Sequence, residues 1–364
     1  MDKRTIVFYI ATLTRGGAER VIVSLANYFC REGWQVYMVT LEPDEGLYPM
    51  ESGIHKIVLT TEPGGGVSGR LRRALERITQ VRRLLKKTRA YALVSFIGKT
   101  NIRAVLAGLG LRTKVFASVR SAPGREYPGK LQRMLARMLF CLADGVVFQS
   151  EGARDFFPKA VRGKSRILFN PLSPEYIREP YRGKRRNEIV SVGRMDPVKN
   201  HALLVDAFAI VVRERPIPEL HLTIYGGGEC MEAVREQARG LGLAERITLP
   251  GDSRDIAEKI KDARVFVLSS DFEGMPNAVA EAFALGIPVV STDCPSGGAR
   301  MLTGADERGL LVPVGDAEKM AAAIMRILDD DALAERLRCA AYRFSLSLHP
   351  DKINQMWKNY IEGI

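Results

Sequence analysis

Few residues in this sequence are suited to build a metal site, a disulfide framework or a membrane span. The four histidines are dispersed, and the cysteines occur singly and never as a C-x-x-C pair. The five cysteines are Cys30, Cys141, Cys230, Cys294 and Cys339. Their scattered placement argues against disulfides and structural zinc and favours a reducing cytoplasm. No stretch approaches about 18 consecutive apolar residues, so we expect a soluble or peripheral protein.

Acidic residues are also in the minority. The sequence has 54 Lys and Arg against 42 Asp and Glu, which gives a formal net charge of +12. This excess favours an anionic partner, and a nucleic acid, an acidic lipid surface and a phosphorylated substrate all fit that description.

Length and hydrophobicity indicate two domains. With 364 residues, of which 46% are hydrophobic, the chain can bury two cores. Thr5–Leu13 is too short to span a membrane and leads into a glycine pair, so we expect a core strand rather than a signal peptide. Strands alternate with helices in both halves, which predicts an α/β fold with two doubly wound, Rossmann-like sheets. We expect an N-terminal domain over 1–177, a linker over 178–187, a C-terminal domain over 188–348 and a closing helix over 349–364.

One unit of the C-terminal half combines two strands, a helix and two carboxylates. Val265–Leu268 and Ile287–Ser291 are predicted strands, and Met275–Leu285 between them is a predicted, nearly all-apolar helix. Glu273 precedes the helix and Glu281 lies inside it, where a carboxylate is costly unless it is paired. A helix that follows a strand suits a phosphate at its N-terminus, with Glu281 accepting hydrogen bonds from a sugar hydroxyl. The alternative is that Glu281 pairs with a core Arg or Lys and that Glu273 is solvated.

Three other motifs are weaker when taken alone. Gly16 and Gly17 precede a helix and allow a ligand to approach the backbone. Gly98–Thr100 reads G-K-T, but Leu93 occupies the position of the leading glycine of a P-loop, so we reject that assignment. Asp329–Asp331 contains a D-x-D pattern between two predicted helices, where a helix cap is the better interpretation.

The most basic run is Arg70–Arg89, which has nine Lys and Arg against one Glu. Its apolar residues fall on one face at helical spacing, so we expect a surface helix. Two interpretations stay open. The basic face is either simply solvated, or it attracts anionic lipid head groups or a lipid-linked diphosphate through Arg72, Arg73 and Arg82.

Five motifs in order resemble a known enzyme family over essentially the whole chain. They are G-G-A-E-R (16–20), V-G-R-M-D-P-V-K-N (192–200), Y-G-G-G-E (225–229), F-E-G-M-P-N-A-V-A-E-A (272–282) and P-V-V-S-T-D (288–293). This set resembles the family 4 retaining glycosyltransferases of the GT-B fold. It is most similar to bacterial members that extend lipid-linked oligosaccharides or surface polysaccharides, including N-acetylgalactosaminyltransferases.

The resemblance implies a role for each domain and for named residues. The N-terminal domain would bind the acceptor, the C-terminal domain would bind the nucleotide-sugar, and the closing helix would pack back on the N-terminal domain. Arg194 and Lys199 would hold the donor diphosphate without a metal, and Gly17 would approach it from the other domain. Glu281 would bind the ribose and Glu273 would lie by the transferred sugar. The segment behind that sugar would be Gly274, Met275, Pro276 and Asn277.

Arg120 departs from the common family pattern. It follows a predicted strand, at the position where many relatives have a His that contacts the donor sugar. An Arg cannot act as a general base, but it can hydrogen-bond the sugar or phosphate. We therefore expect Arg120 and Glu273 to be the catalytic residues, and Asn101 to lie with the basic helix on the acceptor or membrane side.

The expected function is a glycosyltransferase at the inner face of the cell membrane. It would move a hexose or N-acetylhexosamine, GalNAc above all, from a UDP-sugar to a lipid-linked oligosaccharide or polysaccharide. The anomeric configuration would be retained, with no metal or other cofactor and no nucleic-acid partner. Two alternatives remain: a non-catalytic GT-B-like subunit that recruits a partner, and a phosphorylase of the same fold.

Overall fold

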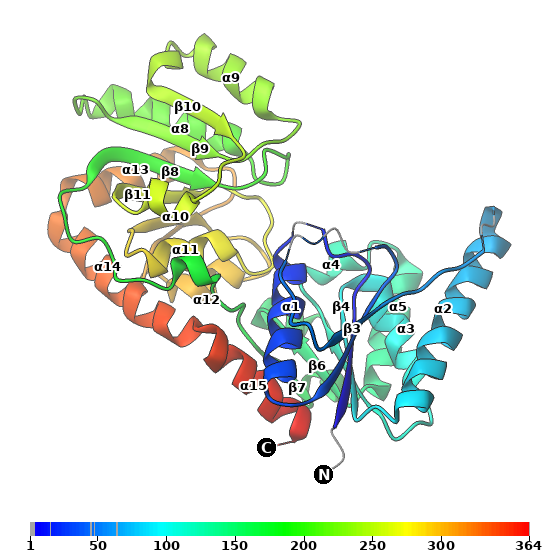
Figure 1. The fold of residues 1–364 in the computed structure, drawn as a ribbon. Helices are drawn as coiled ribbons and strands as arrows, with labels where there is room; N and C mark the ends of the chain where they lie inside the picture. Colours follow the sequence, from blue (N-terminus) through cyan, green and yellow to red (C-terminus); the bar gives the residue numbers. More distant parts are fainter. Residues whose placement is uncertain (1–3, 15, 44–45, 47, 63–64, 364) are drawn as a thin grey trace. The chain divides into compact units, whose positions relative to one another are not determined.

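The computed structural model describes residues 4–14, 16–43, 46, 48–62 and 65–363. The chain divides into two compact units, the first of Met1–Pro171 with Pro350–Ile364 and the second of Leu172–His349. Each unit is a parallel sheet with helices packed on its faces (Figure 1). This confirms the predicted fold of two doubly wound, Rossmann-like sheets.

The first unit has a seven-stranded sheet in the order β3-β2-β1-β4-β5-β6-β7. Its central strands are buried on both faces, which explains why they are continuous apolar runs rather than alternating patterns. The order reverses between β1 and β4, which are adjacent in the sheet. The strands are β1 (Thr5–Tyr9), β2 (Gln35–Thr40), β3 (Ile54–Val58), β4 (Ala92–Phe96), β5 (Lys114–Ser118), β6 (Gly145–Phe148) and β7 (Ser165–Ile167).

Helices α2, α3 and α5 lie on one face of this sheet and α1 and α15 on the other (Figure 1). The helix α15 returns from the end of the chain, and its Trp357 ring stacks on Phe96 of β4 at 5.7 Å between centroids. The Tyr360 hydroxyl of α15 accepts a hydrogen bond from the Val146 N–H of β6 at 3.0 Å. The helices are α1 (Gly17–Arg31), α2 (Gly66–Thr88), α3 (Gly98–Gly108), α4 (Pro123–Glu126), α5 (Lys130–Leu139), α6 (Glu151–Asp155), α7 (Lys159–Arg162) and α15 (Pro350–Glu362). The last residue of the expected closing helix lies outside the described residues.

The second unit has a six-stranded sheet in the order β10-β9-β8-β11-β12-β13. Strands β9 and β10 are therefore added on one side of β8. The chain then crosses to the other side of β8, where β11, β12 and β13 are added in order. The strands are β8 (Arg186–Val192), β9 (His221–Tyr225), β10 (Ile247–Gly251), β11 (Ala263–Leu268), β12 (Val289–Thr292) and β13 (Leu310–Val312).

Seven α-helices accompany these strands in the part of the second unit that the structure describes. They are α8 (His201–Glu214), α9 (Met231–Gly240), α10 (Ile256–Ile260), α11 (Asn277–Ala284), α12 (Gly298–Thr303), α13 (Ala317–Asp329) and α14 (Asp331–Ser345). The Asp330 carboxylate accepts a hydrogen bond from the Leu333 N–H at 2.9 Å and caps α14. The D-x-D pattern is therefore a helix start.

The expected linker over 178–187 belongs to the second unit, because the chain leaves the first unit at Pro171. One of its arginines is bonded to the amino-terminal edge of the second sheet. The Arg185 guanidinium donates to the carbonyls of Ala263 at 2.8 Å and Lys261 at 3.1 Å, and Arg186 is the first residue of β8. The end of the expected linker is therefore part of the second sheet.

Candidate functional site

Two loops meet at the point where the strand order of the second sheet reverses. The loop after β8 (193–200) and the loop after β11 (269–276) follow adjacent parallel strands, but the chain continues from them in opposite directions. In open α/β sheets such a reversal leaves a crevice outside the carboxyl ends of the strands, and ligands bind there. The motifs with Lys199 and Glu273 occupy these two loops.

Hydrogen bonds fasten the two loops to each other. Asn200 adopts the left-handed conformation at φ 44° and caps α8, and its side chain also donates to the Asp271 carboxylate at 2.9 Å. The Asp271 N–H donates to the Val198 carbonyl at 2.9 Å. The Ser269 hydroxyl donates to the Lys199 carbonyl at 2.9 Å. These contacts fix the backbone on both sides of the crevice.

Lys199 and Glu273 form a direct ion pair between the loops. Lys199 Nζ lies 2.5 Å from Glu273 Oε1, and the two side chains are 22% and 13% exposed. The Ser270 hydroxyl donates to the same oxygen at 2.8 Å, and the Ser296 hydroxyl donates to the Glu273 carbonyl. The carboxylate is therefore held in one orientation beside a cation, in a largely desolvated setting where the pairing is stronger than at the surface.

Arg194 is more exposed than Lys199. Its side chain is 81% exposed and makes one long ion pair, 3.6 Å, with the Asp196 carboxylate. Asp196 is in turn anchored by the N–H groups of Val198 and Lys199, each at 3.1 Å. An exposed pair at that distance contributes little, so the guanidinium remains available to an anionic ligand. Among the described residues, no three His, Cys, Asp or Glu side chains gather closely enough to hold a metal ion.

The loop after β9 packs backbone to backbone against the loop after β8. A Cβ on Gly226 would lie 2.1 Å from the Gly193 carbonyl oxygen, and one on Gly228 would lie 2.4 Å from the Met195 carbonyl oxygen. Both glycines have positive φ, of 126° and 153°. Only glycine allows this approach, which accounts for the Y-G-G-G-E motif and supports the loop that carries Arg194.

The segment Gly274–Asn277 leads into the N-terminus of α11. Pro276 is the N-cap and Met275 is buried, so the helix begins two residues later than expected. A Cβ on Gly298 would lie 1.7 Å from the Gly274 carbonyl oxygen, so α12 packs directly on this segment. Glu281, one turn into α11, is 8% exposed. The positive end of α11 thus follows Glu273 by four residues and favours an anion.

Arg120 lies in the first unit and is buried. Its guanidinium donates to the Asn170 side-chain carbonyl and, at 3.4 Å, to the Ser118 hydroxyl, and it stacks over the Phe96 ring at 4.9 Å. Burial lowers the pKa of Arg120 to about 9. Its contacts therefore hold the carboxyl ends of β4, β5 and β7 together, and only 7% of the residue is exposed.

A half-buried carboxylate organises the loops around Arg120. The Glu126 side chain accepts hydrogen bonds from the N–H groups of Gly98 and Arg120, both at 2.8 Å, and of Ser121 at 3.1 Å. Burial raises the pKa of Glu126, and these hydrogen bonds oppose that rise. Glu126 thus binds the amino end of α3 in the way that an anionic ligand would.

Asn101 belongs to the same buried cluster rather than to a surface. Its side chain donates to the Ser118 carbonyl at 2.9 Å and accepts from the Ser95 hydroxyl at 2.8 Å, and the residue is 0% exposed. The expectation that Asn101 meets the acceptor or the membrane directly is therefore wrong for this structure. The G-K-T-N sequence offers no sign that its last residue turns into the sheet.

Gly17 begins α1, directly after β1 and its loop. The preceding Gly16 is held by the Tyr48 hydroxyl, which accepts from the Gly16 N–H at 3.0 Å and donates to its carbonyl at 2.9 Å. Gly17 is exposed at the start of this helix. Its N-terminal position is the one from which backbone N–H groups can meet an anion.

Some basic residues of α2 have partners within the protein, whereas Arg83, Lys86 and Lys87 are exposed. The Arg72 guanidinium pairs with Glu76 at 2.7 Å, and Arg73 is half-buried. The Arg82 guanidinium donates to the carbonyls of Ala107 at 3.0 Å and Leu109 at 2.6 Å. Arg82 therefore satisfies the carboxyl end of α3 rather than facing solvent. None of the helices that the structure describes has the length and hydrophobicity to cross a membrane.

Ser270, Ser296 and Gly298 are site residues that the sequence reasoning did not identify. The two serines orient Glu273, and Gly298 lets α12 approach the Gly274 backbone. All three follow the strands β11 and β12 of the second sheet, at the carboxyl ends where parallel sheets bind ligands. Their position after a strand was the one sequence feature that could have indicated them.

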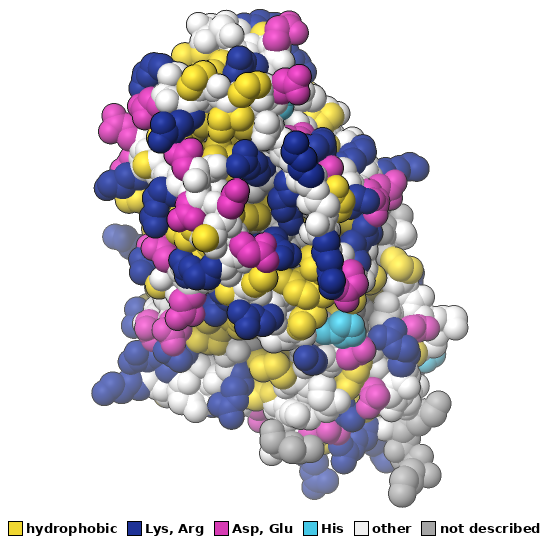
Figure 2. Space-filling model, turned by 90° about the vertical axis from the view of Figure 1, so that its left-hand side faces the viewer, with side chains coloured by type: hydrophobic (Ala, Val, Ile, Leu, Met, Phe, Trp, Pro, Cys, Tyr) yellow, Lys and Arg dark blue, Asp and Glu magenta, His cyan; other side chains and the backbone are white. Residues whose placement is uncertain are grey.

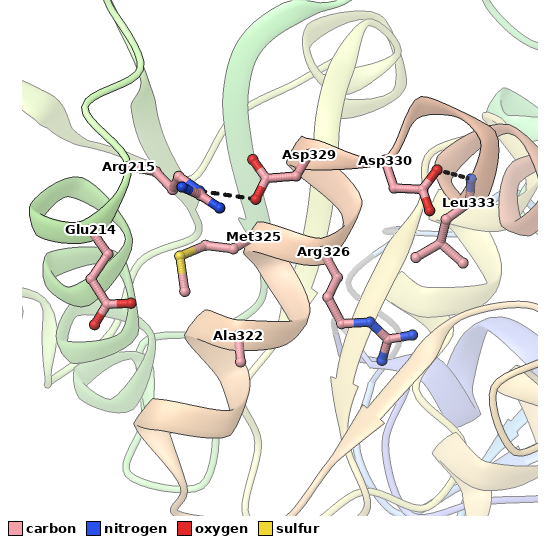
Figure 3. Close-up of a pocket in the computed structure, with 8 residues that line it drawn as sticks. All are labelled: Glu214, Arg215, Ala322, Met325, Arg326, Asp329, Asp330 and Leu333. Carbon is pink, nitrogen blue, oxygen red and sulfur yellow. Dashed lines mark hydrogen bonds and ion pairs between the residues drawn. The ribbon is translucent and has the colours of Figure 1, made fainter.

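A cavity of about 550 Å³ lies at the other edge of the second sheet (Figure 3). It is bordered by the end of α8 and the end of α13, where Arg215 pairs with Asp329 at 2.9 Å. The two helices run away from the loops at the carboxyl ends of the strands, so this cavity is separate from Lys199 and Glu273. On the face drawn in Figure 2, basic and acidic side chains are interspersed rather than gathered in one patch.

Two family models match the chain, one in each unit. The glycosyl transferase 4-like domain matches residues 16–172, and the glycosyl transferases group 1 model matches residues 186–330. The first match includes Gly17 and Arg120. The second includes Lys199, Glu273 and the whole crevice at the strand reversal.

Two similar curated proteins come from Campylobacter jejuni. One is the GalNAc-alpha-(1->4)-GalNAc-alpha-(1->3)-diNAcBac-PP-undecaprenol alpha-1,4-N-acetyl-D-galactosaminyltransferase, which is 25% identical over 99% of this chain and 98% of its own length. The other is the N-acetylgalactosamine-N,N'-diacetylbacillosaminyl-diphospho-undecaprenol 4-alpha-N-acetylgalactosaminyltransferase, which is 26% identical over 98% of both chains.

Solved structures share the fold over the whole chain. The Anabaena protein HepE in complex with UDP has a TM-score of 0.81 and 17% identity, covering 99% of this chain and 100% of its own. A glycosyltransferase from Rickettsia africae has a TM-score of 0.80 and 16% identity, covering 100% of this chain and 99% of its own. Both comparisons establish the GT-B fold.

Proposed function

Because the chain belongs to the glycosyl transferases that combine a 4-like domain with a group 1 domain, we propose that it is a retaining, metal-independent enzyme. It transfers a hexose or N-acetylhexosamine, GalNAc in the first instance, from a UDP-sugar to a lipid-linked oligosaccharide or polysaccharide. The observation that carries this proposal is the Lys199–Glu273 pair at the reversal of the second sheet, with the exposed Arg194 on the same loop as Lys199.

The proposed chemistry uses the charges of this crevice. The donor diphosphate lies at Arg194 and Lys199, which offset the negative charge that grows on the leaving phosphate. The bond between the sugar C1 and the phosphate oxygen breaks, and its electron pair stays on UDP. The acceptor hydroxyl forms the new C1–O bond on the same face and gives its proton to the leaving phosphate. Glu273 orients the sugar through a charged hydrogen bond, and Glu281 binds the ribose.

The choice of donor and acceptor is supported by the similar proteins. Both Campylobacter jejuni relatives are described as N-acetylgalactosaminyltransferases with undecaprenol-linked acceptors, and HepE was crystallised with UDP. A lipid-linked acceptor is confined to a membrane, so we place this enzyme on the inner face of the cell membrane, as a peripheral protein.

The proposed metal independence is supported by the same two cations. Arg194 and Lys199 supply the positive charge that a divalent ion supplies in other glycosyltransferases, so turnover continues in excess chelator. Loss of turnover in chelator, with recovery on adding Mn²⁺, would contradict this part of the proposal.

The decisive experiment is a donor panel with an undecaprenyl-diphosphate-linked glycan as acceptor. UDP-GalNAc is expected to be consumed fastest among UDP-GalNAc, UDP-GlcNAc, UDP-galactose, UDP-glucose and GDP-mannose. Lys199→Met should lose UDP affinity, whereas Lys184→Met, an exposed lysine at the opposite edge of the same unit, should bind UDP as the parent does. No transfer from any donor to a glycan, or transfer to free phosphate instead, would refute the proposed function.

A further inference from the structure

Helix α5 exposes a row of large apolar side chains to solvent. They are Leu131 (63% exposed), Met134 (51%) and Met138 (61%), followed by Leu142 (59%) in the short 3-10 helix Phe140–Leu142 that continues α5. Their spacing of three, four and four residues places them on one face of the helix. An exposed apolar row of this kind marks an interaction surface rather than a random scatter of surface residues.

A parallel row of cations borders this apolar face. Lys130, Arg133 and Arg137 each precede one of the exposed apolar residues, so they lie about 100° further round the helix. None of the three forms an ion pair within the described part of the chain, and α5 itself contains no Asp or Glu. The Arg137 guanidinium instead lies over the Phe156 ring at 5.7 Å.

The same face is hollowed. A cavity of about 620 Å³ lies between α5 and the segment that follows α6, with Met134, Met138, Phe156 and Pro158 among its lining residues. Its lining is mainly apolar, and the cations of α5 stand at its border. The surface Lys130–Leu142 therefore combines adaptable apolar side chains, an open hollow and unpaired positive charge.

We propose that the surface Lys130–Leu142 docks on an anionic lipid bilayer. Leu131, Met134 and Met138 enter the boundary between head groups and acyl chains, and the three cations lie among the lipid phosphates. Charge complementarity favours an anionic membrane as the partner. The unpaired cations match the lipid phosphates, and the apolar row beside them matches the acyl chains. The inference rests on the proposed function in one respect. A lipid-linked acceptor lies in a membrane, which gives the enzyme a reason to bind one.

Helix α2 shares part of this chemistry. Arg72 is paired with Glu76 and Arg82 is bonded to carbonyls of the α3 end, but Arg83, Lys86 and Lys87 are exposed. Exposed apolar residues of α2 are Val67, Leu71 and Leu75. What distinguishes α5 is that its three cations and two of its exposed methionines line one hollow, so a variant of α2 is the control for basic charge alone.

The test measures binding of the full chain to vesicles of phosphatidylcholine with or without 30% phosphatidylglycerol, by co-sedimentation. Replacing Lys130, Arg133 and Arg137 together by Gln should weaken binding to the anionic vesicles roughly 100-fold, at about 1 kcal/mol for each cation near the surface. Replacing Leu131, Met134 and Met138 together by Ser should also weaken it at least tenfold. The protein should bind vesicles without phosphatidylglycerol poorly in every case.

A matched control removes the same charge from another exposed helix of the same unit. The triple variant Arg83→Gln, Lys86→Gln and Lys87→Gln in α2 should bind within about threefold of the parent. UDP affinity and circular dichroism should be unchanged in all variants, which shows that each is folded and separates this test from the proposed enzymatic function.

Three outcomes would overturn the proposal. Parent-like binding by both α5 variants would remove α5 from the membrane surface. An equal loss in the α2 control would show that total charge, not this surface, governs binding. The third outcome is that the parent protein does not bind vesicles but forms a dimer, while the Ser variant is monomeric. In that case α5 would be an interface between copies of this chain.

Discussion

The Lys199 ammonium and the Glu273 carboxylate are separated by 74 positions in the sequence, yet Nζ and Oε1 lie 2.5 Å apart. The pair spans the two loops at the strand reversal, so it exists only because β8 and β11 are neighbours. In the proposed function, the donor diphosphate shares Lys199 with Glu273. The carboxylate would then hold the lysine in place before the donor arrives.

The first prediction concerns Glu273→Gln. This change removes the negative charge beside Lys199, so UDP affinity should be kept or increased. The transfer rate should fall about 10- to 100-fold, because a charged hydrogen bond worth roughly 1.5–3 kcal/mol is lost. Calorimetric titration with UDP and initial-rate measurements would check both. Ser270→Ala, which removes one support of the carboxylate, should lower the rate by less. A loss of UDP affinity in Glu273→Gln would contradict this assignment.

The second prediction concerns Glu281→Gln. A neutral amide accepts hydrogen bonds from ribose hydroxyls more weakly than a carboxylate, so UDP affinity should fall about tenfold or more. The control uses 2′-deoxy-UDP, which binds the parent more weakly than UDP. In Glu281→Gln that difference should largely disappear, because the missing hydroxyl no longer has a charged partner. An undiminished difference would show that Glu281 does not meet the ribose.

The third prediction concerns pH and His201. Burial, with a smaller effect of the nearby Lys199 cation, lowers the pKa of His201 to about 4. Between its unfolded value of about 6.5 and 4, the unfolded chain binds a proton that the folded chain does not. The neutral His201 therefore contributes to the free energy of unfolding in full above pH 6.5. This contribution is lost as the pH falls toward 4, by about 3 kcal/mol in total.

His201→Leu should therefore flatten the pH dependence of unfolding between pH 6.5 and 5, measured with urea and circular dichroism. His55→Gln serves as the control because that side chain is exposed, and it should keep the slope of the parent. The prediction fails if His201→Leu loses stability with falling pH as steeply as the parent.

The sequence predicted the elements and much of the site because both follow from local chemistry. Apolar runs that end in polar turns located Lys199 and Glu273 at strand ends, and parallel strands bring those ends to one edge. The direct contact between the two side chains was not predicted, because it depends on rotamers across two loops. The position of Ser270 after a strand was visible in the sequence, but its hydrogen bond to the Glu273 carboxylate was not.

Several polar and basic side chains have partners inside the protein that the sequence did not indicate. Arg185 and Arg82 both lie in basic runs, and both donate to backbone carbonyls at the ends of other elements. Asn101 and Arg120 likewise turn into a buried polar cluster. Composition and helical period indicate which face a residue occupies, but they do not reveal a partner that arrives from a distant part of the chain.

The fourth prediction concerns Gly298→Ala. The added Cβ would lie 1.7 Å from the Gly274 carbonyl oxygen, a backbone atom that cannot move without displacing the loop behind Glu273. The free energy of unfolding should fall by about 1–3 kcal/mol or more, and sugar transfer should slow with it. Gly240→Ala is the matched control, since no atom lies within 4 Å of its Cβ position in α9. That variant should be unchanged or up to about 1 kcal/mol more stable. Equal stability of the two variants would contradict the close packing of α12.

The last prediction concerns Arg120, the residue at which the chain departs from the common family pattern. Removing its side chain takes one hydrogen bond from Asn170, which keeps its hydrogen bond with the Gln149 amide, and one from Ser118, and it uncovers the Phe96 ring. Each lost hydrogen bond costs about 0.5–1.5 kcal/mol and the cavity adds to this cost, so Arg120→Ala should lower the melting temperature measurably. UDP affinity should stay unchanged, because the side chains proposed to hold UDP, those of Arg194, Lys199 and Glu281, belong to the other unit.

Arg120→Lys separates charge from geometry. Lysine keeps the positive charge but loses the planar fork that reaches Asn170 and Ser118 at once, so we expect it to resemble Arg120→Ala in both stability and sugar transfer. Rates should be measured well below each variant's melting temperature, so that unfolding does not imitate a slower reaction. If Arg120→Lys keeps most of the parent's rate of sugar transfer, the reaction needs the charge rather than directed hydrogen bonds. Parent-like transfer in Arg120→Ala, together with reduced stability, would make Arg120 a structural residue and end the parallel with the family's His.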